Sequence, residues 1–130
     1  MLEDAEVAIV TAGSITSTAR IAIKTLREKG HKVGLLKIRL FRPFPVEEIQ
    51  HALKGKKKIA VIDRNISLGS GGIFCQELRA ALVHSSDHPL TFSYIAGIGG
   101  TDVDPEIIGK IALDAKKRTE PVDTPLWIME

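Results

Sequence analysis

The feature that most constrains the fold is a short apolar run that ends in charged residues and leads through glycines into a helical pattern. Residues 58–63, Lys-Ile-Ala-Val-Ile-Asp, are followed by Arg64, by the loop Gly69-Ser-Gly-Gly72, and by a pattern that predicts a helix over 73–83. Apolar, β-branched runs of this length predict buried strands. Strands that alternate with helices predict a parallel sheet, whose working surface lies at the carboxyl ends of the strands.

The remaining segments continue this alternation. We expect further strands at 7–12, 33–39 and 90–95, and helices over 15–29, over 45–53 and from Asp104 to Lys116. Gly30 is a natural stop for the first helix. Asp104-Pro105-Glu106 combines a capping carboxylate, a proline at the first helical position and an acid in the first turn. The order of the elements predicts an α/β fold of three α/β/α layers with a mostly parallel, open sheet.

The chain divides into a domain over residues 1–116 and a tail over 117–130. With 130 residues, the chain is long enough for one core. Two prolines prevent the tail from continuing the last helix, but it ends in Leu126-Trp-Ile-Met129 with the only tryptophan of the sequence. Burial of a tryptophan is strongly favourable. We therefore expect the tail to dock, either on its own domain or, in preference, on another domain or subunit.

The composition argues against several classes of protein. No apolar run approaches the ~20 residues of a membrane span, and the acidic first residues lack a signal-peptide core. The formal net charge of +2 argues against a nucleic-acid binder, and we interpret the basic run Lys54–Lys58 as a solvated turn at a helix end. Only one cysteine, Cys75, is present, which fits a reducing, cytoplasmic location.

The known motifs for cofactors and nucleophiles are incomplete. Gly69 and Gly71 have the spacing of a dinucleotide-binding loop, but Phe74 stands where the third glycine should be, and no P-loop or nucleophile elbow is present. A single cysteine cannot hold a cluster, and we expect Cys75 to be buried and inert. The histidines show no ligand spacing and are expected to face solvent: His31, His51, His84 and His88.

Two charged groups follow the strands of the expected working edge. We interpret Asp63 and Arg64 as a buried or half-buried ionic link that fixes a loop, in preference to a catalytic pair. Arg39 and Arg42 flank Phe41 and suit the carboxylates of a substrate or of a neighbouring subunit. The sequence therefore offers a rigid scaffold without a complete active site, which is typical of a subunit or a fragment.

Four segments carry a family resemblance. Residues 4–14, 34–45, 62–72 and 97–102 resemble, in order and spacing, the C-terminal part of the alpha subunit of pyruvate:ferredoxin oxidoreductase (pyruvate synthase), and the similarity runs over 4–116. The Asp-Arg pair before the glycine loop looks more like the pyruvate enzymes than the 2-oxoglutarate enzymes. The branched-chain 2-oxoacid enzymes remain an alternative.

The resemblance implies a fold similar to the C-terminal domain of transketolase. It implies an enzyme complex that oxidatively decarboxylates a 2-oxoacid with coenzyme A, giving acyl-CoA, CO₂ and reduced ferredoxin. Thiamine diphosphate, magnesium and iron–sulfur clusters would belong to the complete enzyme and not to this chain. The implied partners are the thiamine-fold domain of the same subunit, subunits of the beta, gamma and delta types, ferredoxin and coenzyme A. The thiamine-fold region itself is missing from this sequence.

The resemblance implies that this domain packs against others and holds no cofactor. We accordingly expect interface or structural residues instead of catalytic ones. A stand-alone α/β module that binds an anionic small molecule through its edge loops is the alternative function. The expected interface and structural residues are Arg39, Phe41, Arg42, Phe44, Asp63, Arg64, Gly69, Gly71, Gly72 and Trp127.

Overall fold

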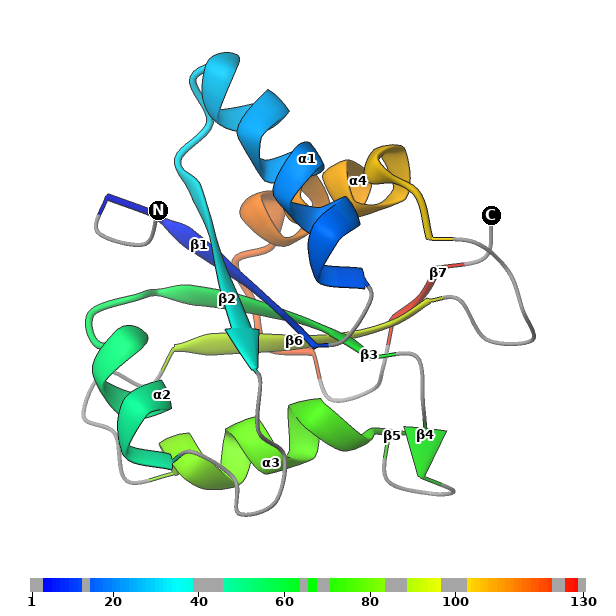
Figure 1. Ribbon diagram of the computed structural model, residues 1–130. Coiled ribbons are helices and arrows are strands. Elements are labelled where there is room, and N and C mark those ends of the chain that lie inside the picture. Colours follow the sequence, from blue (N-terminus) through cyan, green and yellow to red (C-terminus); the bar gives the residue numbers. More distant parts are fainter. Residues whose placement is uncertain are drawn as a thin grey trace.

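The computed structural model is a five-stranded parallel sheet between two layers of helices (Figure 1). It describes residues 4–12, 15–38, 46–63, 66–67, 71–83, 89–96, 103–122 and 126–128. Helices α1 (Ile15–Glu28) and α4 (Pro105–Lys117) cover one face of the sheet. Helices α2 (Val46–Ala52) and α3 (Ile73–Leu82) cover the other face. No helix in the described parts of the chain is long and apolar enough to cross a membrane.

The strands lie in the order β2-β1-β3-β6-β7, and every neighbouring pair in this sheet is parallel. This confirms the expected α/β fold with its mostly parallel sheet. A separate two-stranded antiparallel hairpin, which the sequence did not suggest, precedes α3. The strands are β1 (Val7–Ala12), β2 (Val33–Ile38), β3 (Lys58–Asp63), β4 (Ile66–Ser67), β5 (Gly71–Gly72), β6 (Leu90–Ala96) and β7 (Leu126–Ile128).

Strand β3 lies at the centre of the sheet, which explains its continuous apolar run. Residues 59–63 are all buried. Successive side chains of a strand point to opposite faces, so Ala60 and Ile62 pack in the α1/α4 layer while Ile59 and Val61 pack in the α2/α3 layer. Because both faces are covered by helices, a hydrophobic residue is favoured at each of these positions.

Local signals fix two of the helix ends. Gly30 has a φ of +91°; its N–H donates to the carbonyl of Arg27, and the next N–H donates to the carbonyl of Leu26. This pair of bonds is a Schellman motif, so the expected glycine stop is confirmed. The Asp104 side chain accepts a hydrogen bond of 2.9 Å from the N–H of Ile107, which confirms the expected cap of α4.

Part of the tail belongs to the sheet. β7 pairs in parallel with β6 in the register Tyr94↔Leu126 and Ile95↔Trp127. The described part of the tail therefore docks on its own domain. The sequence favoured the other mode, in which the tail docks on another domain or subunit. The domain boundary placed at residue 116 therefore excludes a strand of the sheet. The physical reason is that β7 satisfies main-chain groups at the carboxyl half of β6, which would otherwise be an open edge.

Candidate functional site

Asp63 stands at the carboxyl end of the central strand and is only 1% exposed. Its Oδ2 accepts a hydrogen bond of 3.1 Å from the main-chain N–H of Cys75, the third residue of α3. The first N–H groups of a helix have no partner within the helix, and the helix dipole favours a negative charge beside them. Asp63 thus caps α3 from a different element. Arg64, its expected partner, lies outside the described residues.

Cys75, whose main-chain N–H binds Asp63, packs in the core between the sheet and the α2/α3 layer. Cys75 is 1% exposed, which confirms that this cysteine is buried. Burial raises the pKa of the thiol above its usual value, because the thiolate would lose its hydration. A thiol in this environment is a weak nucleophile and a poor metal ligand.

A second polar contact joins the carboxyl end of β1 to the start of α1. The hydroxyls of Thr11 on β1 and Thr16 in the first turn of α1 are 3.1 Å apart, and each residue is 2% exposed. Strands β1 and β3 are neighbours with Val10 opposite Val61, so Thr11 and Asp63 reach the same edge of the sheet. The sequence reasoning missed this pair. The available signal was a threonine at the end of an apolar run and another in the next helical turn.

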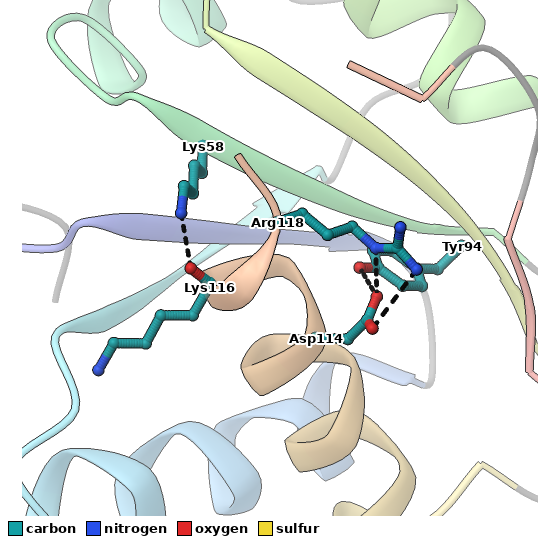
Figure 2. Close-up of polar contacts among 5 residues, drawn as sticks. All are labelled: Lys58, Tyr94, Asp114, Lys116 and Arg118. Atoms are coloured by element: carbon teal, nitrogen blue, oxygen red, sulfur yellow. Dashed lines mark hydrogen bonds and ion pairs between the residues drawn. The ribbon is translucent and has the colours of Figure 1, made fainter. Parts of the chain in front are cut away.

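A third polar group joins the sheet to the end of α4 (Figure 2). The Tyr94 hydroxyl donates a hydrogen bond of 2.6 Å to Oδ2 of Asp114, and the same oxygen accepts one of 2.7 Å from Nε of Arg118. Tyr94 lies on β6 and is fully buried, whereas Asp114 and Arg118 are half-buried. This group therefore connects the buried sheet with the point where the chain leaves α4 toward β7.

The charges of this group reinforce one another. Burial, followed by the hydrogen bond to Asp114, raises the pKa of the Tyr94 hydroxyl, so the neutral phenol is strongly favoured. Burial alone would raise the pKa of the Asp114 carboxyl, but the hydrogen bonds from Arg118 and Tyr94 outweigh it and lower that pKa. The Asp114 carboxylate raises the pKa of the Arg118 guanidinium. The three residues therefore favour a neutral Tyr94, an ionised Asp114 and an ionised Arg118, and their hydrogen bonds hold the end of α4 against β6.

The structure brings some of the expected site residues together. Asp63 is opposite Ile95 in the sheet, and Ile95 is opposite Trp127, so Asp63 and Trp127 lie in one row across the carboxyl edge. Gly71 and Gly72 form β5, directly before the helix that Asp63 caps. The other expected site residues lie outside the described residues: Arg39, Phe41, Arg42, Phe44, Arg64 and Gly69.

Within the described parts of the chain, no group of three or more histidine, cysteine, aspartate or glutamate side chains could hold a metal ion. The polar contacts at the carboxyl edge and behind it fix helices to strands. Asp63 caps a helix, Thr11 ties β1 to α1, and Asp114 holds Tyr94. Each of these contacts joins a helix to a strand of the sheet.

Comparison with known proteins identifies the family. Residues 5–108 match the family described as pyruvate:ferredoxin oxidoreductase core domain II. The chain is 45% identical over 119 residues to ketoisovalerate oxidoreductase subunit VorA of Pyrococcus furiosus, with 92% of this chain and 30% of the relative covered. It is 43% identical over 114 residues to pyruvate synthase subunit PorA of Thermotoga maritima, with 88% of this chain and 29% of the relative covered.

Other comparisons agree with this assignment. Pyruvate synthase subunit PorA of Methanothermobacter thermautotrophicus is 42% identical over 127 residues, which cover 97% of this chain and 31% of that protein. A solved chain of a split-gene transketolase shares the fold, with a TM-score of 0.65 and 15% identity over 87% of this chain and 40% of that chain. The chain thus spans about 30% of the length of these curated relatives. The resemblance found in four sequence segments is confirmed, and the chain belongs to the pyruvate:ferredoxin oxidoreductase core domain II family.

Proposed function

We propose that this chain is the core domain II part of the alpha-type subunit of a 2-oxoacid:ferredoxin oxidoreductase. The complete enzyme would oxidatively decarboxylate a 2-oxoacid with coenzyme A to acyl-CoA, CO₂ and reduced ferredoxin. The observation that carries the proposal is the family match over residues 5–108, together with 42–45% identity to PorA and VorA subunits. The proposed activity belongs to the whole assembly, since the chain spans about 30% of these relatives.

Within that assembly, we assign this domain a packing role. Several of its described polar side chains hold helices to the sheet, as the bonds of Asp63 and Tyr94 illustrate. The thiamine diphosphate, magnesium and iron–sulfur clusters of the enzyme would be bound by the thiamine-fold domain and by subunits of the beta, gamma and delta types. These cofactors would supply the decarboxylation and electron-transfer chemistry. A cytoplasmic location fits the single, buried cysteine.

Pyruvate is the proposed substrate, on the basis of the Asp63-Arg64 pair that precedes the glycine loop. Ketoisovalerate, a branched-chain 2-oxoacid, is the second candidate, because a ketoisovalerate oxidoreductase subunit is 45% identical to this chain. The two substrates differ in the bulk beside the carbonyl group. Their ratio of kcat/KM in the assembled enzyme therefore discriminates between them.

The carboxyl edge is the proposed contact surface of this domain. Asp63, Gly71, Gly72 and Trp127 belong to elements that reach this edge, and residues 41–45, which lie outside the described residues, follow β2 in the sequence. Aromatic and arginine side chains are favoured in the centres of interfaces. Hydrogen exchange of the chain, alone and in the assembled enzyme, should show joint protection of 41–45 and 69–72. Protection confined to the opposite edge would contradict this assignment.

The function is tested by purifying the complete complex that contains this chain. We expect coenzyme A-dependent reduction of ferredoxin with pyruvate, formation of acetyl-CoA, and slower turnover with ketoisovalerate. Activity with ketoisovalerate alone would replace pyruvate as the proposed substrate and leave the proposed reaction class unchanged. A purified complex with neither activity would refute the proposed function.

The cofactor assignment has its own test. Titration calorimetry of this chain with thiamine diphosphate and magnesium should give no binding heat, and the same titration of the complete enzyme freed of cofactor should give saturable binding. The alternative of a stand-alone anion-binding module predicts instead that the isolated chain binds a phosphate or carboxylate ligand saturably at its edge loops. Micromolar binding of thiamine diphosphate to this chain would contradict the packing role.

A further inference from the structure

The amino edge of the sheet, opposite the edge discussed above, collects lysines from three separate parts of the chain. The helices run antiparallel to the strands, so α1, α2 and α4 all end where strands begin (Figure 1). The turns and helix ends at this edge carry a set of lysines that we call the basic edge: Lys29, Lys32, Lys54, Lys56, Lys57, Lys58, Lys116 and Lys117.

Hydrogen bonds hold these three parts side by side. Nζ of Lys58 donates a bond of 2.6 Å to the carbonyl of Lys116 (Figure 2). Nζ of Lys116 lies 3.0 Å from Nδ1 of His31, which is half-buried and does not simply face solvent as expected. The N–H of Glu6 donates to the carbonyl of Lys32. Segments that are distant in the sequence therefore form one continuous surface.

Neutralisation of helix ends accounts for only part of this charge. Lys58 binds a carbonyl in the last turn of α4, as a cation at a helix C-terminus should. By contrast, no hydrogen bond or ion pair joins the side chains of five exposed lysines to any described residue. These five are Lys29, Lys32, Lys54, Lys57 and Lys117.

The nearby acids offset only part of this charge. Asp4 pairs with Arg27 at 2.8 Å and Asp114 pairs with Arg118 at 2.7 Å, and these two carboxylates also attract Lys32 and Lys117. Glu6 and Glu28 are further exposed acids close to the basic edge in the sequence. The edge therefore carries more positive charge than the formal +2 of the whole chain, and the rest of the chain is net negative. Such an asymmetric distribution produces a directional field that attracts and orients a negatively charged partner.

The basic edge also contains a hollow. A cavity of about 420 Å³ lies between the start of β1, the turn before β3 and the end of α4. Lys57, Lys58 and Lys116 line it together with Glu6 and Gly55. A protruding side chain of a partner could enter this hollow between the ammonium groups.

We propose that the basic edge docks a carboxylate-rich segment of another protein or domain. The helix ends at this edge are C-terminal, so their carbonyls repel an anion that approaches the backbone closely. A phosphate site would typically use helix N-termini or free arginine forks, whereas Arg27 and Arg118 already bind Asp4 and Asp114, and Arg79 in the last turn of α3 donates to the carbonyl of Thr91. Long lysine side chains instead hold spaced, hydrated carboxylates away from the backbone. This proposal does not depend on the proposed function.

The test measures the binding of a fluorescent decaglutamate peptide to the full chain by anisotropy. The basic-edge variant is Lys32→Glu/Lys57→Glu/Lys117→Glu. The matched control, Lys24→Glu/Lys37→Glu/Lys110→Glu, changes the net charge equally at exposed lysines elsewhere. We expect the basic-edge variant to bind about tenfold or more weakly and the control to change by less than about threefold. Raising the salt concentration from about 50 to about 200 mM should weaken binding to the unmodified chain.

Three results would overturn the proposal. These are equal losses in the two triple variants, no measurable binding to the unmodified chain, or tighter binding of an oligophosphate than of decaglutamate at equal charge. Circular dichroism establishes that each variant is folded. If the glutamate variant does not fold, Lys32→Gln/Lys57→Gln/Lys117→Gln removes the charge without reversing it, and it should still lose about threefold or more in affinity.

Discussion

Asp63 and Cys75 are joined by a hydrogen bond of 3.1 Å from the Cys75 main-chain N–H to the Asp63 carboxylate, across twelve positions of the sequence. The bond ties the central strand β3 to the helix α3 that covers it. Because Asp63 is 1% exposed, removal of its carboxylate would leave the Cys75 N–H in a buried site with poor access to water. Asp63 thus helps to hold the start of α3, in addition to the apolar packing of Leu78 and Leu82.

We predict that Asp63→Ala lowers the free energy of unfolding by about 2 kcal/mol, through loss of a helix cap and of a buried acceptor. Asp63→Asn keeps an acceptor and should lose about half as much. Urea unfolding followed by circular dichroism measures both. Asp104→Ala is the matched control, since it removes a similar bond of 2.9 Å at an exposed cap and should cost about 1 kcal/mol.

In the assembled enzyme, Asp63→Ala should reduce stability or subunit affinity more than turnover. This follows from the proposed packing role of the carboxyl edge. Size-exclusion chromatography and steady-state kinetics of the same preparation separate the two effects. A complex that assembles normally but turns over orders of magnitude more slowly would assign Asp63 to the chemistry.

We predict that Tyr94→Phe destabilises the fold by about 1–2 kcal/mol at neutral pH, because the phenol hydroxyl donates to a charged acceptor. The variant should also change how the free energy of unfolding depends on pH in the alkaline range. The folded pKa of Tyr94 is raised above its ordinary value of 10, so its contribution is complete below about pH 10 and is lost as the pH rises through the folded pKa. The free energies of unfolding of the unmodified chain and the variant, measured at neutral and alkaline pH, should converge as the pH rises.

The stabilisation by Asp114 should depend on pH in the opposite direction, because it is lost at acid pH. Its folded pKa is lowered from 3.8, so the carboxylate stabilises the fold above about pH 4, and this stabilisation is lost as the pH falls through the folded pKa. Asp114→Asn should therefore be less stable than the unmodified chain at pH 7 and approach it below pH 4. A difference that is constant across this range would contradict the assignment.

Removal of residues 123–130 should destabilise the domain by about 2–3 kcal/mol, because β7 and its apolar residues are lost from the sheet. Hydrogen exchange should then be faster along the carboxyl half of β6. A chain that lacks only Met129 and Glu130 is the control and should keep its stability. Blue-shifted Trp127 fluorescence in the unmodified chain, poorly quenched by acrylamide, would report a docked tail.

Cys75 should react slowly with a disulfide reagent such as Ellman's reagent. The thiol is 1% exposed and its pKa is raised by burial, so both access and thiolate population are low. We expect the reaction to be at least about 100-fold slower in the native chain than in denaturant. Rapid stoichiometric labelling of the native chain would show that α3 opens readily.

Much of the secondary structure could be predicted because its signals are local. The apolar runs at β1, β3 and β6 need only the strand period and length, and Gly30 and Asp104 mark helix ends through their own φ angle and side-chain bond. The alternation of elements then led to a parallel sheet covered on both faces. The family resemblance rested on similarly local groups of residues.

The tertiary structure alone decided which distant groups meet. The sequence shows Asp63 at a strand end, but its described partner is a main-chain N–H, which every residue except proline carries and which no motif can indicate. The pairing of Tyr94 with Asp114, the addition of β7 to β6, and the gathering of three lysine segments at one edge all depend on strand order and register. Strand order and register are set by packing over the whole chain, and for that reason no local pattern encodes them.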